Sequence, residues 1–516
     1  MTPLGGILNL RANALDGQLL GIRGYAAIGL YLSLAFLLYR MVQTIYRLYF
    51  HPLRHFLGPK EACVSEAWLY HVTKKGAPNE VFEALHRKYK CRALRVAPNE
   101  LHIDDVSLYK VIYNQLSPFP KSPAFYAAFN IPHTVFTETD PSKHKERRRL
   151  LNSLFSRSGA LRLEPVIRTK LFSVGEKIDR LCVTKPVDTY DAFRLLTTEV
   201  ILEFAFARSA NMITEHADSF KSWFLDAFDV ASQSIFDMQY RPFVRHLAGI
   251  LPSCVIRVLN PNVGTLLDVI KFAGESLHHF KQRSSLPDHP VVFDSLKGLP
   301  DRDGVSEAQD ILVAGADTTA FTLTTGIMHI VSNPDVQQKL TSSLLDAIDP
   351  DGEFPTLLTL ERIEYLTACV KESLRVGMAV PGRLPRVVPW DRAKPFVVDG
   401  KIVPPGTIVS MTAYTMHTST EAWGPDARLF RPERWLGPES QGLDQYLCTF
   451  SKGTRMCLGQ NIASAEITIA LAYIFSKYRL SLPKDFEFPQ KEDRFTYAYL
   501  SPGASISFSK RGKTRS

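Results

Sequence analysis

The sequence predicts a mainly α-helical protein with small β-sheets. An apolar pattern runs from Ser306 to Val331, and at ~1.5 Å per residue its helix would be about 40 Å long. A second helix is predicted from Pro334 and a third over residues 364–376. Strand-like stretches are short in comparison and cover residues 93–96, 101–103, 396–398 and 408–411. Helix therefore dominates, and no repeat or long linker divides the chain into several folded domains.

The composition of the 516 residues is that of an ordinary globular protein, with 45% hydrophobic and 22% charged residues. This composition excludes a disordered or fibrous chain and a multi-span membrane protein. The net charge of +9 is modest, and no basic and aromatic repeat indicates nucleic-acid binding. The seven scattered cysteines contain no C-x-x-C pair, which favours neither a disulfide framework nor a zinc site. We therefore expect the main body of the chain in a reducing compartment.

The first element in chain order is a predicted transmembrane helix over residues 24–46. Only Arg40 interrupts its apolar run, and a span takes ~20 mostly apolar residues. More Lys and Arg follow the run than precede it, which places the bulk of the chain in the cytosol. The aromatic and basic residues 46–50 suit a membrane interface and not the cleavage site of a signal peptide. We expect a luminal segment at 1–23, a single-pass anchor at 24–46 and one folded domain at 47–516.

The elements of the folded domain have their own start and stop signals. Ser306 and Gln309 form a capping box for the long helix, and Asn333 followed by Pro334 ends it. Strands 396–398 and 408–411 flank the turn signal Pro404-Pro405-Gly406. Near the C-terminus, the apolar residues 462–475 predict one more buried helix.

The strongest chemical signal is the pattern F-x-x-G-x-R-x-C-x-G, formed by Phe450, Gly453, Arg455, Cys457 and Gly459. If Cys457 binds iron, each position has a use. Gly453 permits the tight loop that turns backbone N–H groups toward a thiolate, and Phe450 shields the sulfur from water. Arg455 supplies a cation for a haem propionate, and Gly459 lets the next helix approach the macrocycle. An inert buried cysteine is the alternative, but five fixed positions favour an iron ligand.

This pattern resembles the cysteine loop of the cytochrome P450 superfamily, the haem-thiolate monooxygenases. Glu372 and Arg375 match its E-x-x-R motif, and Glu372 lies 85 residues before Cys457. Between them, residues 432–435 read P-E-R-W and provide Arg434. The resemblance implies a structural network in which Arg375 and Arg434 hold the buried Glu372 carboxylate. It extends over most of the chain and implies the P450 fold, with a haem-thiolate monooxygenase domain at 47–516.

Residues 314–319, which read A-G-A-D-T-T, resemble the oxygen-binding groove of the same family. Gly315 and the Thr318 hydroxyl, which can bond to a carbonyl one turn earlier, would loosen the helix there. The resemblance implies that Asp317 and Thr318 are catalytic and organise proton delivery. A plain polar interruption of a buried helix is the alternative.

Further basic residues are candidates for the haem propionates. Many members carry W-x-x-x-R early in the chain, and here His144 stands in place of the tryptophan, with Arg148 one turn later. A solvated basic helix face is the alternative for this pair. Arg386 resembles a further propionate arginine of the family. Arg386 lies one residue farther from the E-x-x-R motif than is usual in the family, so Arg383 is the alternative.

Within the superfamily, the chain is most similar to membrane-bound fungal members of secondary metabolism, trichodiene oxygenase-like enzymes among them. The stretches 45–53, 95–103 and 121–133 carry this likeness. The candidates for substrate contact, for each of which core packing is the alternative, are Phe125, Tyr126, Phe129, Ile311, Phe321 and Val380.

We therefore expect a haem b enzyme, with Cys457 as axial thiolate and metal ligand, that inserts one oxygen atom from O2 into an apolar small molecule by hydroxylation or epoxidation. The chain has no flavin or nicotinamide motif, so the resemblance implies electrons from NADPH through a flavoprotein reductase. The expected location is the endoplasmic reticulum membrane, with the catalytic domain in the cytosol and a substrate that could be a terpenoid. A haem-thiolate isomerase or dehydratase and a non-catalytic haem sensor are the alternatives.

Overall fold

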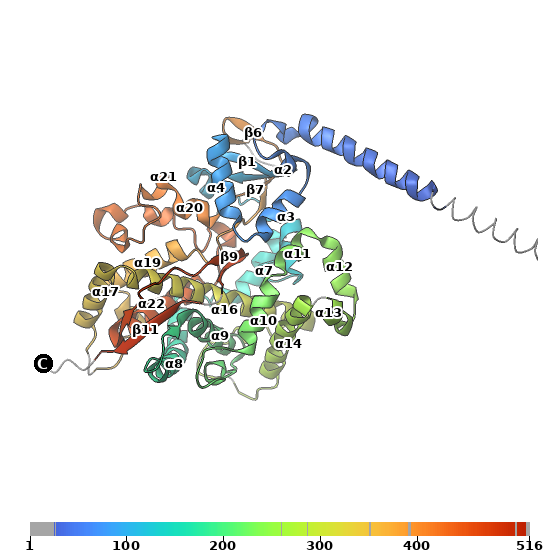
Figure 1. Ribbon diagram of the computed structural model, residues 1–516. Helices are drawn as coiled ribbons and strands as arrows, with labels where there is room; N and C mark the ends of the chain where they lie inside the picture. The colour runs from blue at the N-terminus through green and yellow to red at the C-terminus, as the bar shows by residue number, and fades with distance from the viewer. Residues whose placement is uncertain are drawn as a thin grey trace, which may run out of the picture.

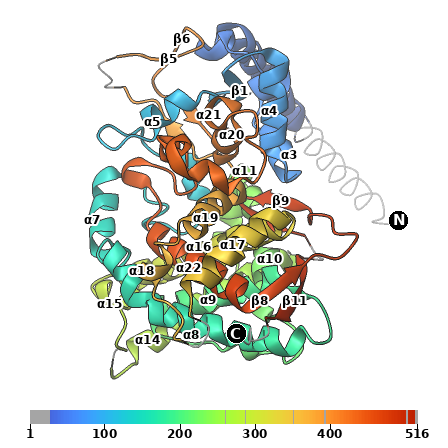
Figure 2. The same ribbon diagram turned by 90° about the vertical axis from the view of Figure 1, so that its left-hand side faces the viewer.

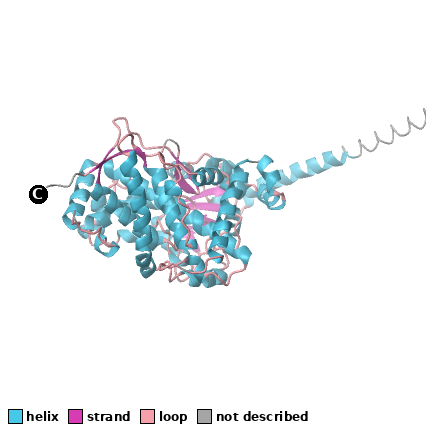
Figure 3. Ribbon diagram, turned by 90° about the horizontal axis from the view of Figure 1, so that it is seen from below, coloured by secondary structure: helices cyan, strands magenta, loops and turns pink. Residues whose placement is uncertain are grey.

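The computed structural model describes residues 25, 27–259, 261–285, 287–349, 352–390, 394–500 and 503–511. The expected luminal segment at 1–23 lies outside these residues. Helices make up most of the molecule and the sheets are small, as Figure 3 shows. The predicted fold class is therefore confirmed.

The helices of eight or more residues beyond the N-terminal one are α3 (Ala67–Lys74), α4 (Pro78–Tyr89), α7 (Pro141–Leu151), α8 (Arg157–Leu181), α9 (Thr189–Phe206), α10 (Trp223–Ser232), α12 (Pro242–Ile250), α14 (Pro261–Lys281), α16 (Asp301–Val331), α17 (Pro334–Ala347), α19 (Glu364–Gly377) and α22 (Gln460–Lys477). Shorter α-helices connect them: α2 (Lys60–Val64), α5 (Tyr109–Ile112), α6 (Pro123–Tyr126), α11 (Ile235–Tyr240), α13 (Ser253–Leu259), α15 (Val292–Ser295), α18 (Leu357–Leu360), α20 (Ala413–Thr418) and α21 (Thr420–Trp423). Single 3-10 turns such as η4 (Ala127–Phe129), η6 (Pro432–Trp435) and η9 (Gly453–Arg455) complete the loops near the site.

Helix α16 is the axis of the domain and packs against α9, α14, α19 and α22 (Figure 2). It ends at Val331 as predicted, but it begins at Asp301 and not at the capping box. Pro300 precedes the first turn, where Asp301 and Asp303 suit the positive end of the helix dipole. Ser306 lies inside the helix and is buried. The helices predicted from Pro334, over 364–376 and over 462–475 are present as α17, α19 and α22.

In the residues that the structure describes, the strands form four small sheets. The largest has the order β1-β2-β7-β4, from Ala93–Ala97, Glu100–Ile103, Ile408–Ser410 and Arg386–Val387. In it β2 and β7 are parallel, with Leu101 opposite Val409. The remaining strands are β3 (Val187–Asp188), β5 (Phe396–Val398), β6 (Lys401–Val403), β8 (Tyr478–Ser481), β9 (Lys491–Arg494), β10 (Thr496–Tyr499) and β11 (Ser505–Lys510).

Strand β6 corrects the expectation that strands 396–398 and 408–411 flank one turn. β5 forms a hairpin with β6, and β7 joins the larger sheet instead. The sequence hides β6 because it is only three residues long and lies directly before Pro404.

An apolar helix, Ala27–Phe50, extends away from the domain, and the window that matches a membrane span has no residue buried (Figure 1). Its 24 residues reach about 36 Å at ~1.5 Å each, enough for a bilayer core of ~30 Å. The domain holds the end of this helix, since Arg95 Nη1 donates to the Arg47 carbonyl at 3.0 Å and Arg47 Nη1 donates to the Val64 carbonyl at 2.5 Å. The residues predicted to span the membrane are therefore helical where the structure describes them, and this helix, which runs four residues beyond 46, is compatible with a membrane anchor.

Candidate functional site

Cys457 lies between the turn η9 and the start of α22, in a loop that is folded back on itself. Its N–H donates to the Phe450 carbonyl at 2.8 Å, which closes the loop. Gly453 has a φ of +77°, and a Cβ there would lie 2.4 Å from the Asn114 carbonyl oxygen. Both the backbone angle and the close approach require glycine. The loop predicted from the sequence pattern is therefore built as expected.

The surroundings of the Cys457 thiol combine burial with groups that stabilise a thiolate. Burial raises its pKa, whereas the N–H groups of Gly459 and Gln460 and the charge of Arg148 act in the opposite direction. The side chain is nevertheless exposed to a space wide enough for solvent. A Cβ on Gly459 would meet only the Cys457 sulfur, at 4.0 Å. The Cys457 side chain is therefore accessible, as an iron ligand requires.

Helix α16 has exposed side chains near its middle, although most of the helix is buried. Val313 has 40% of its surface exposed, Ala314 is exposed, and Thr318 is partly exposed. The Thr318 hydroxyl donates to the Ala314 carbonyl at 2.9 Å, the bond expected from the sequence. One face of α16 thus borders open space at the A-G-A-D-T-T segment.

Gly315 serves a different purpose from the one expected. A Cβ on it would lie 2.6 Å from Cγ1 of Ile201 on α9, so glycine lets the two helices pack closely. Helix α16 continues through this point without interruption. Gly315 is therefore a packing position, and only Thr318 makes the local bond expected at the groove.

Asp317 points away from Thr318 and into a buried polar group. Its Oδ1 accepts a hydrogen bond from the Tyr190 hydroxyl at 2.9 Å and lies 2.9 Å from Nε of Arg194. Arg194 also pairs with Asp229 at 2.7 Å. The structure therefore brings Asp317 together with α9 and not with the space beside Thr318.

A group of basic side chains lies next to the cysteine loop. The group comprises Lys121, His144, Arg148, Arg386 and Arg455, and we call it the cation cluster. Burial and the neighbouring Arg386 lower the pKa of Arg455 to about 10. Burial, Arg455 and Lys121 lower the pKa of His144 to about 3, which leaves its ring neutral. Burial and the three arginines of the group also lower the pKa of Lys121 well below its usual value.

Cations that repel one another in a buried place indicate a missing anion. Asp310 attracts Lys121, and Glu138 attracts Arg455, but Arg148 and Arg386 act against both cations. The two propionates of haem would supply the negative charge that the cation cluster lacks. The residues present therefore fit haem b: Cys457 would hold its iron, and the cation cluster would hold its propionates.

The structure also separates Arg386 from its rival Arg383. Arg386 Nη1 donates to the Tyr126 hydroxyl at 2.9 Å and lies in the cation cluster. Arg383 is instead paired with Glu100 and donates to the Tyr240 hydroxyl at 2.6 Å. Arg386 is therefore the candidate for a propionate. Lys121 carried no signal in the sequence, because nothing in the stretch 121–133 marks that lysine as buried.

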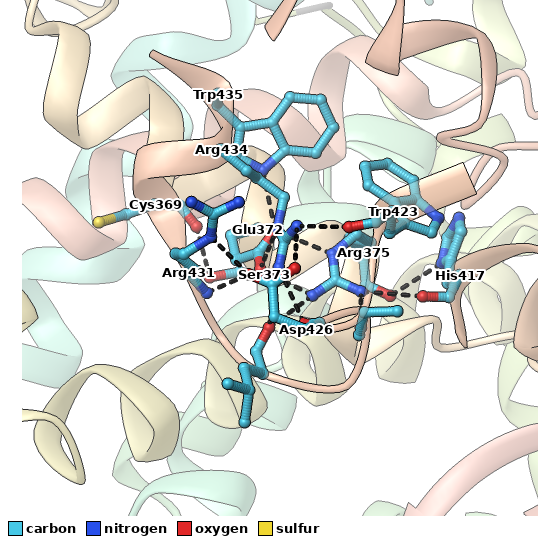
Figure 4. Close-up of polar contacts among 12 residues, drawn as sticks. Cys369, Glu372, Ser373, Arg375, His417, Trp423, Asp426, Arg431, Arg434 and Trp435 are labelled. Atoms are coloured by element: carbon cyan, nitrogen blue, oxygen red, sulfur yellow. Dashed lines mark hydrogen bonds and ion pairs between the residues drawn. The ribbon is translucent and has the colours of Figure 1, made fainter. Parts of the chain in front are cut away.

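The expected network around Glu372 is present and completely buried (Figure 4). Arg375 Nη2 and Nε donate to the two Glu372 carboxylate oxygens at 2.7 and 2.9 Å, and Arg434 Nε donates to Oε1 at 3.1 Å. The Arg431 N–H and the Trp435 indole N–H complete it at 2.8 and 2.9 Å. Although burial opposes it, these donors lower the pKa of Glu372 overall, so the carboxylate is ionised.

His417 connects this network to the cysteine loop, a role that the sequence did not suggest. Arg375 Nη1 donates to the His417 carbonyl at 2.8 Å, and His417 Nδ1 lies 2.8 Å from the Arg375 carbonyl. Because a carbonyl only accepts, Nδ1 carries the proton, and Nε2 accepts from the Cys448 N–H at 2.9 Å. The buried ion network thereby holds residue 448, nine positions before the predicted ligand.

Aromatic side chains gather near the predicted substrate contacts. The rings of Phe129 and Phe136 lie 5.0 Å apart, and Phe495 lies 4.8 Å from Phe129. Phe125 is 5.2 Å from Tyr126. We call these five residues the aromatic cluster. Phe136 and Phe495 come from segments that the sequence did not connect with Phe125, Tyr126 and Phe129.

The other three predicted contacts lie elsewhere. Phe321 is fully buried and stacks on Tyr499 at 4.5 Å, which favours core packing, the alternative to substrate contact. Ile311 is buried among the helices of the larger core. Val380, which follows α19, is partly exposed.

The comparisons with known proteins agree with this site. A family model described as cytochrome P450 matches residues 64–508. The cytochrome P450 monooxygenase macH of Penicillium terrestre is 31% identical, over 89% of this chain and 92% of its own length. The cytochrome P450 monooxygenase sdnE of Sordaria araneosa is 30% identical, over 92% and 96%. The N-acetyltryptophan 6-hydroxylase ivoC of Emericella nidulans is 31% identical, over 86% and 90%.

Proposed function

The chain belongs to the cytochrome P450 family and is a haem-thiolate monooxygenase of fungal secondary metabolism, and we propose here which of its residues support that reaction. Haem b with a cysteine thiolate supplies the activation of O2 when it is bound, with electrons from NADPH through a reductase. We assign the thiolate to Cys457. The observation that carries the assignment is the open space at its sulfur beside the cation cluster.

The cation cluster is the proposed propionate site. Arg148, Arg386 and Arg455 remain charged and would donate to the carboxylate oxygens of haem, and neutral His144 would donate through one ring nitrogen. We add Lys121, whose Nζ also lies 4.2 Å from the centre of the Tyr126 ring. Phe450 and Gly453 shape the loop around the thiolate, and Gly459 leaves room above it.

Thr318 is the proposed catalytic residue for proton delivery, because its hydroxyl is on the partly exposed face of α16. A proton passes through that hydroxyl from water during oxygen activation. For Asp317 we propose an indirect role that supports Thr318. Its buried carboxylate fixes this turn of α16 against Arg194 and Tyr190.

The proposed substrate is an apolar small molecule that the aromatic cluster receives. One relative is named for a reaction on N-acetyltryptophan, and aromatic walls suit flat or polycyclic carbon skeletons. A terpenoid and an aromatic compound both meet this description. The products differ from their substrates by one oxygen atom, as a hydroxyl or an epoxide.

For the location, we propose a single-pass anchor at the helix Ala27–Phe50 in the endoplasmic reticulum membrane, with the domain in the cytosol. The basic residues Arg40, Arg47, Arg54 and Lys60 on the domain side support this orientation. Helices α12 and α13 lie on the same side of Figure 1 as this helix, and they expose Phe243, Ile250, Val258 and Leu259. This apolar surface would meet the same bilayer. The proposed electron donor is a flavoprotein reductase in that membrane.

One experiment tests the proposed function. The membrane fraction that contains the full chain is incubated with a fungal reductase, NADPH and a panel of terpenoid and aromatic compounds under isotopically labelled dioxygen. We expect one labelled oxygen atom in the product. Products that carry no label from dioxygen would contradict a monooxygenase reaction, and membranes that carry the chain with Cys457→Ala serve as the control.

A further inference from the structure

A small cavity beside the aromatic cluster has walls of two kinds. Phe125, Phe495 and other apolar side chains form most of its wall, and its volume is about 20 Å³, which holds roughly one water molecule. Asn79 of α4, Asp493 of β9 and Arg383 line the same space. Because Phe125 and Phe495 also belong to the aromatic cluster, these polar groups adjoin the space proposed for substrate.

The polar side chains from α4 and β9 are bonded to each other and almost completely buried. Asn79 is 2% exposed and Asp493 is 3% exposed. Asn79 Nδ2 donates to Asp493 Oδ2 at 3.2 Å, and a Cβ on Gly382 would lie 3.0 Å from the same oxygen. Burial raises the pKa of Asp493 to about 6. At pH 8 the carboxylate is therefore ionised and only accepts hydrogen bonds.

One oxygen atom of this pair has no partner. Within the described part of the chain, no group donates a hydrogen bond to Asn79 Oδ1. The carboxylate fixes the orientation of the amide, because an amide oxygen turned toward Asp493 would be repelled. A buried acceptor without a donor is costly and rare in folded proteins. The end of the cavity at Asn79 and Asp493 therefore requires a hydrogen-bond donor.

The charges around the cavity indicate which donor suits it. Arg383 pairs with Glu100 and donates to the Tyr240 hydroxyl at 2.6 Å, so its guanidinium is held in place. Its positive charge acts on Asp493 and opposes the rise in the pKa of that carboxyl group. A cationic ligand would meet Arg383 there, and an anionic ligand would meet Asp493. A neutral hydroxyl or N–H group avoids both repulsions.

Asp493 also holds the aromatic wall next to it. Phe495 has a φ of +78°, which a residue with a bulky side chain rarely adopts. Its N–H donates to Asp493 Oδ1 at 2.9 Å, which stabilises this turn between β9 and β10. Backbone strain of this kind is often retained where a side chain must be held for function. The same carboxylate thus fixes the aromatic ring and provides an acceptor beside it.

We propose that this cavity anchors a neutral hydroxyl or N–H group of the substrate, which donates to the oxygens of Asn79 and Asp493. We call these two residues the donor anchor. The substrate is then an apolar skeleton that carries a hydrogen-bond donor at the end remote from the oxidised carbon. The skeleton lies between the rings of Phe125 and Phe495, whose centres are 6.3 Å apart and which separate by side-chain rotation. The proposal rests on the function proposed above for the same site.

The test uses the full-length haem-loaded protein in detergent at pH 8, with imidazole probes that carry an alkyl chain. The far end of the chain is a hydroxyl group, a methyl ether or a carboxylate, and several chain lengths are compared. The ether accepts hydrogen bonds but donates none, so it is the matched partner of the alcohol. The change in haem absorbance gives the Kd of each probe.

Two variants change the donor anchor, and a third is the control. Asp493→Asn removes the charge and keeps the shape, whereas Asn79→Leu/Asp493→Leu makes this end of the cavity apolar. Asp399→Asn is the matched control, because Asp399 also accepts from backbone N–H groups, those of Arg92 and Ala93, at 2.9 and 3.0 Å. Asp399 lies in the turn between β5 and β6 and does not line the cavity.

At the chain length that binds best, the wild-type protein should bind the alcohol about tenfold or more tightly than the ether, because hydrogen bonds to charged groups are strong. The carboxylate probe should bind more weakly than the ether. The preference for the alcohol should fall to about threefold in Asp493→Asn, disappear in the double variant and stay within about twofold of wild type in Asp399→Asn.

Equal binding of alcohol and ether by the wild-type protein at every chain length would overturn the donor anchor and assign the cavity to a buried water molecule. An unchanged preference in Asp493→Asn, or an equal loss in Asp399→Asn, would overturn it as well, even if the double variant does not fold. Thermal unfolding with the same probes is a second readout that needs no iron, and the alcohol should raise the Tm more than the ether. Protein that binds no haem but keeps this difference in Tm would contradict the proposed function and support the donor anchor.

Discussion

The Cys457 side chain is exposed, and the backbone N–H groups of Gly459 and Gln460 stabilise its thiolate. We predict that Cys457→Ala removes the thiolate-specific, strongly red-shifted absorbance band of the reduced carbon monoxide complex. Cys448→Ala is the matched control, because that thiol is buried nine residues earlier and its pKa is raised by burial to about 12. Retention of the band in Cys457→Ala, or its loss in a folded Cys448→Ala variant, would contradict the assignment.

The hydroxyl of Thr318 gives a prediction about mechanism. Thr318→Ala should keep the fold and the haem spectrum, because alanine is a better helix former than threonine. Proton delivery should become disordered, and a positioned proton donor is worth roughly 10²–10⁴-fold in rate. We therefore expect NADPH consumption to continue while product falls and hydrogen peroxide rises, measured with the same reductase supply.

The neighbouring residue Asp317 provides the contrast for Thr318. Asp317→Ala leaves Arg194 with Asp229 as its remaining strong partner, so it should lower the free energy of unfolding by about 1–3 kcal/mol. Thr318→Ala should lower it by less. An unchanged ratio of product to NADPH in Thr318→Ala would show that this hydroxyl only packs.

Single residues were predictable from sequence where a short motif fixes them. Cys457, Gly453 and Glu372 stand in such motifs, and each has the local geometry that its motif implies. Lys121 and Phe495 have no such motif. They reach the site through the tertiary fold, Lys121 from the loop before α6 and Phe495 from the turn between β9 and β10.

At the scale of elements, the Glu372 network joins α19 to the turn η6. Glu372→Ala should prevent stable folding, because removing one partner of a buried ion network costs ~3–5 kcal/mol and a typical protein has only ~5–15 kcal/mol of stability. The measurement is the yield of soluble, haem-loaded protein. Glu433→Ala is the control, since Glu433 is a half-buried carboxylate on η6 that pairs with Lys339. Normal haem-loaded yields for Glu372→Ala would contradict its buried role.

Glu466 on α22 gives a prediction about pH. Burial raises its pKa from 4.5 to about 8, opposed by a hydrogen bond with Thr319 of α16. Because the folded protein keeps this proton while the unfolded chain loses it near pH 4.5, stability falls as the pH rises from 4.5 to 8. Glu466→Gln should therefore stabilise the protein by about 1–3 kcal/mol at pH 8 and change little at pH 5. Thermal unfolding of the haem-loaded protein at both pH values tests this, and an equal effect at both would contradict it.

Helices with a strong hydrophobic periodicity were predictable from the sequence, but the residues at which they begin were less predictable. The start of α16 was placed five residues late because Ser306 and Gln309 imitate a cap, whereas Pro300 and two aspartates begin the helix. Gly315 was interpreted as a loosened turn because the sequence gives no view of Ile201 on the adjacent α9. Both differences come from contacts between distant segments.

At the scale of the whole molecule, the anchor and the domain meet at Arg47. The contacts that Arg47 makes with Arg95 and Val64 lie on the domain side of residue 46. A chain that lacks residues 1–46 should therefore still fold and bind haem, with a free energy of unfolding within about 1 kcal/mol of the full chain. Loss of the haem-loaded domain on this truncation would contradict the separation of anchor and domain.

The same truncated chain tests the second contact with the membrane. Phe243 on α12 and Val258 on α13 are 74% and 82% exposed, so replacing both with serine should not disturb the fold. The truncated chain should retain weak binding to phosphatidylcholine vesicles through this apolar surface, and Phe243→Ser/Val258→Ser should reduce that binding about tenfold or more, since each buried apolar side chain contributes roughly 1.5–3 kcal/mol. Leu116→Ser, which changes a 94% exposed side chain in the loop after α5, is the control and should bind as the truncated parent does. Cosedimentation with vesicles measures the binding of the truncated parent, the double variant and the control. Equal binding of the parent and the double variant would show that α12 and α13 face water. The anchor helix alone would then hold the protein at the membrane.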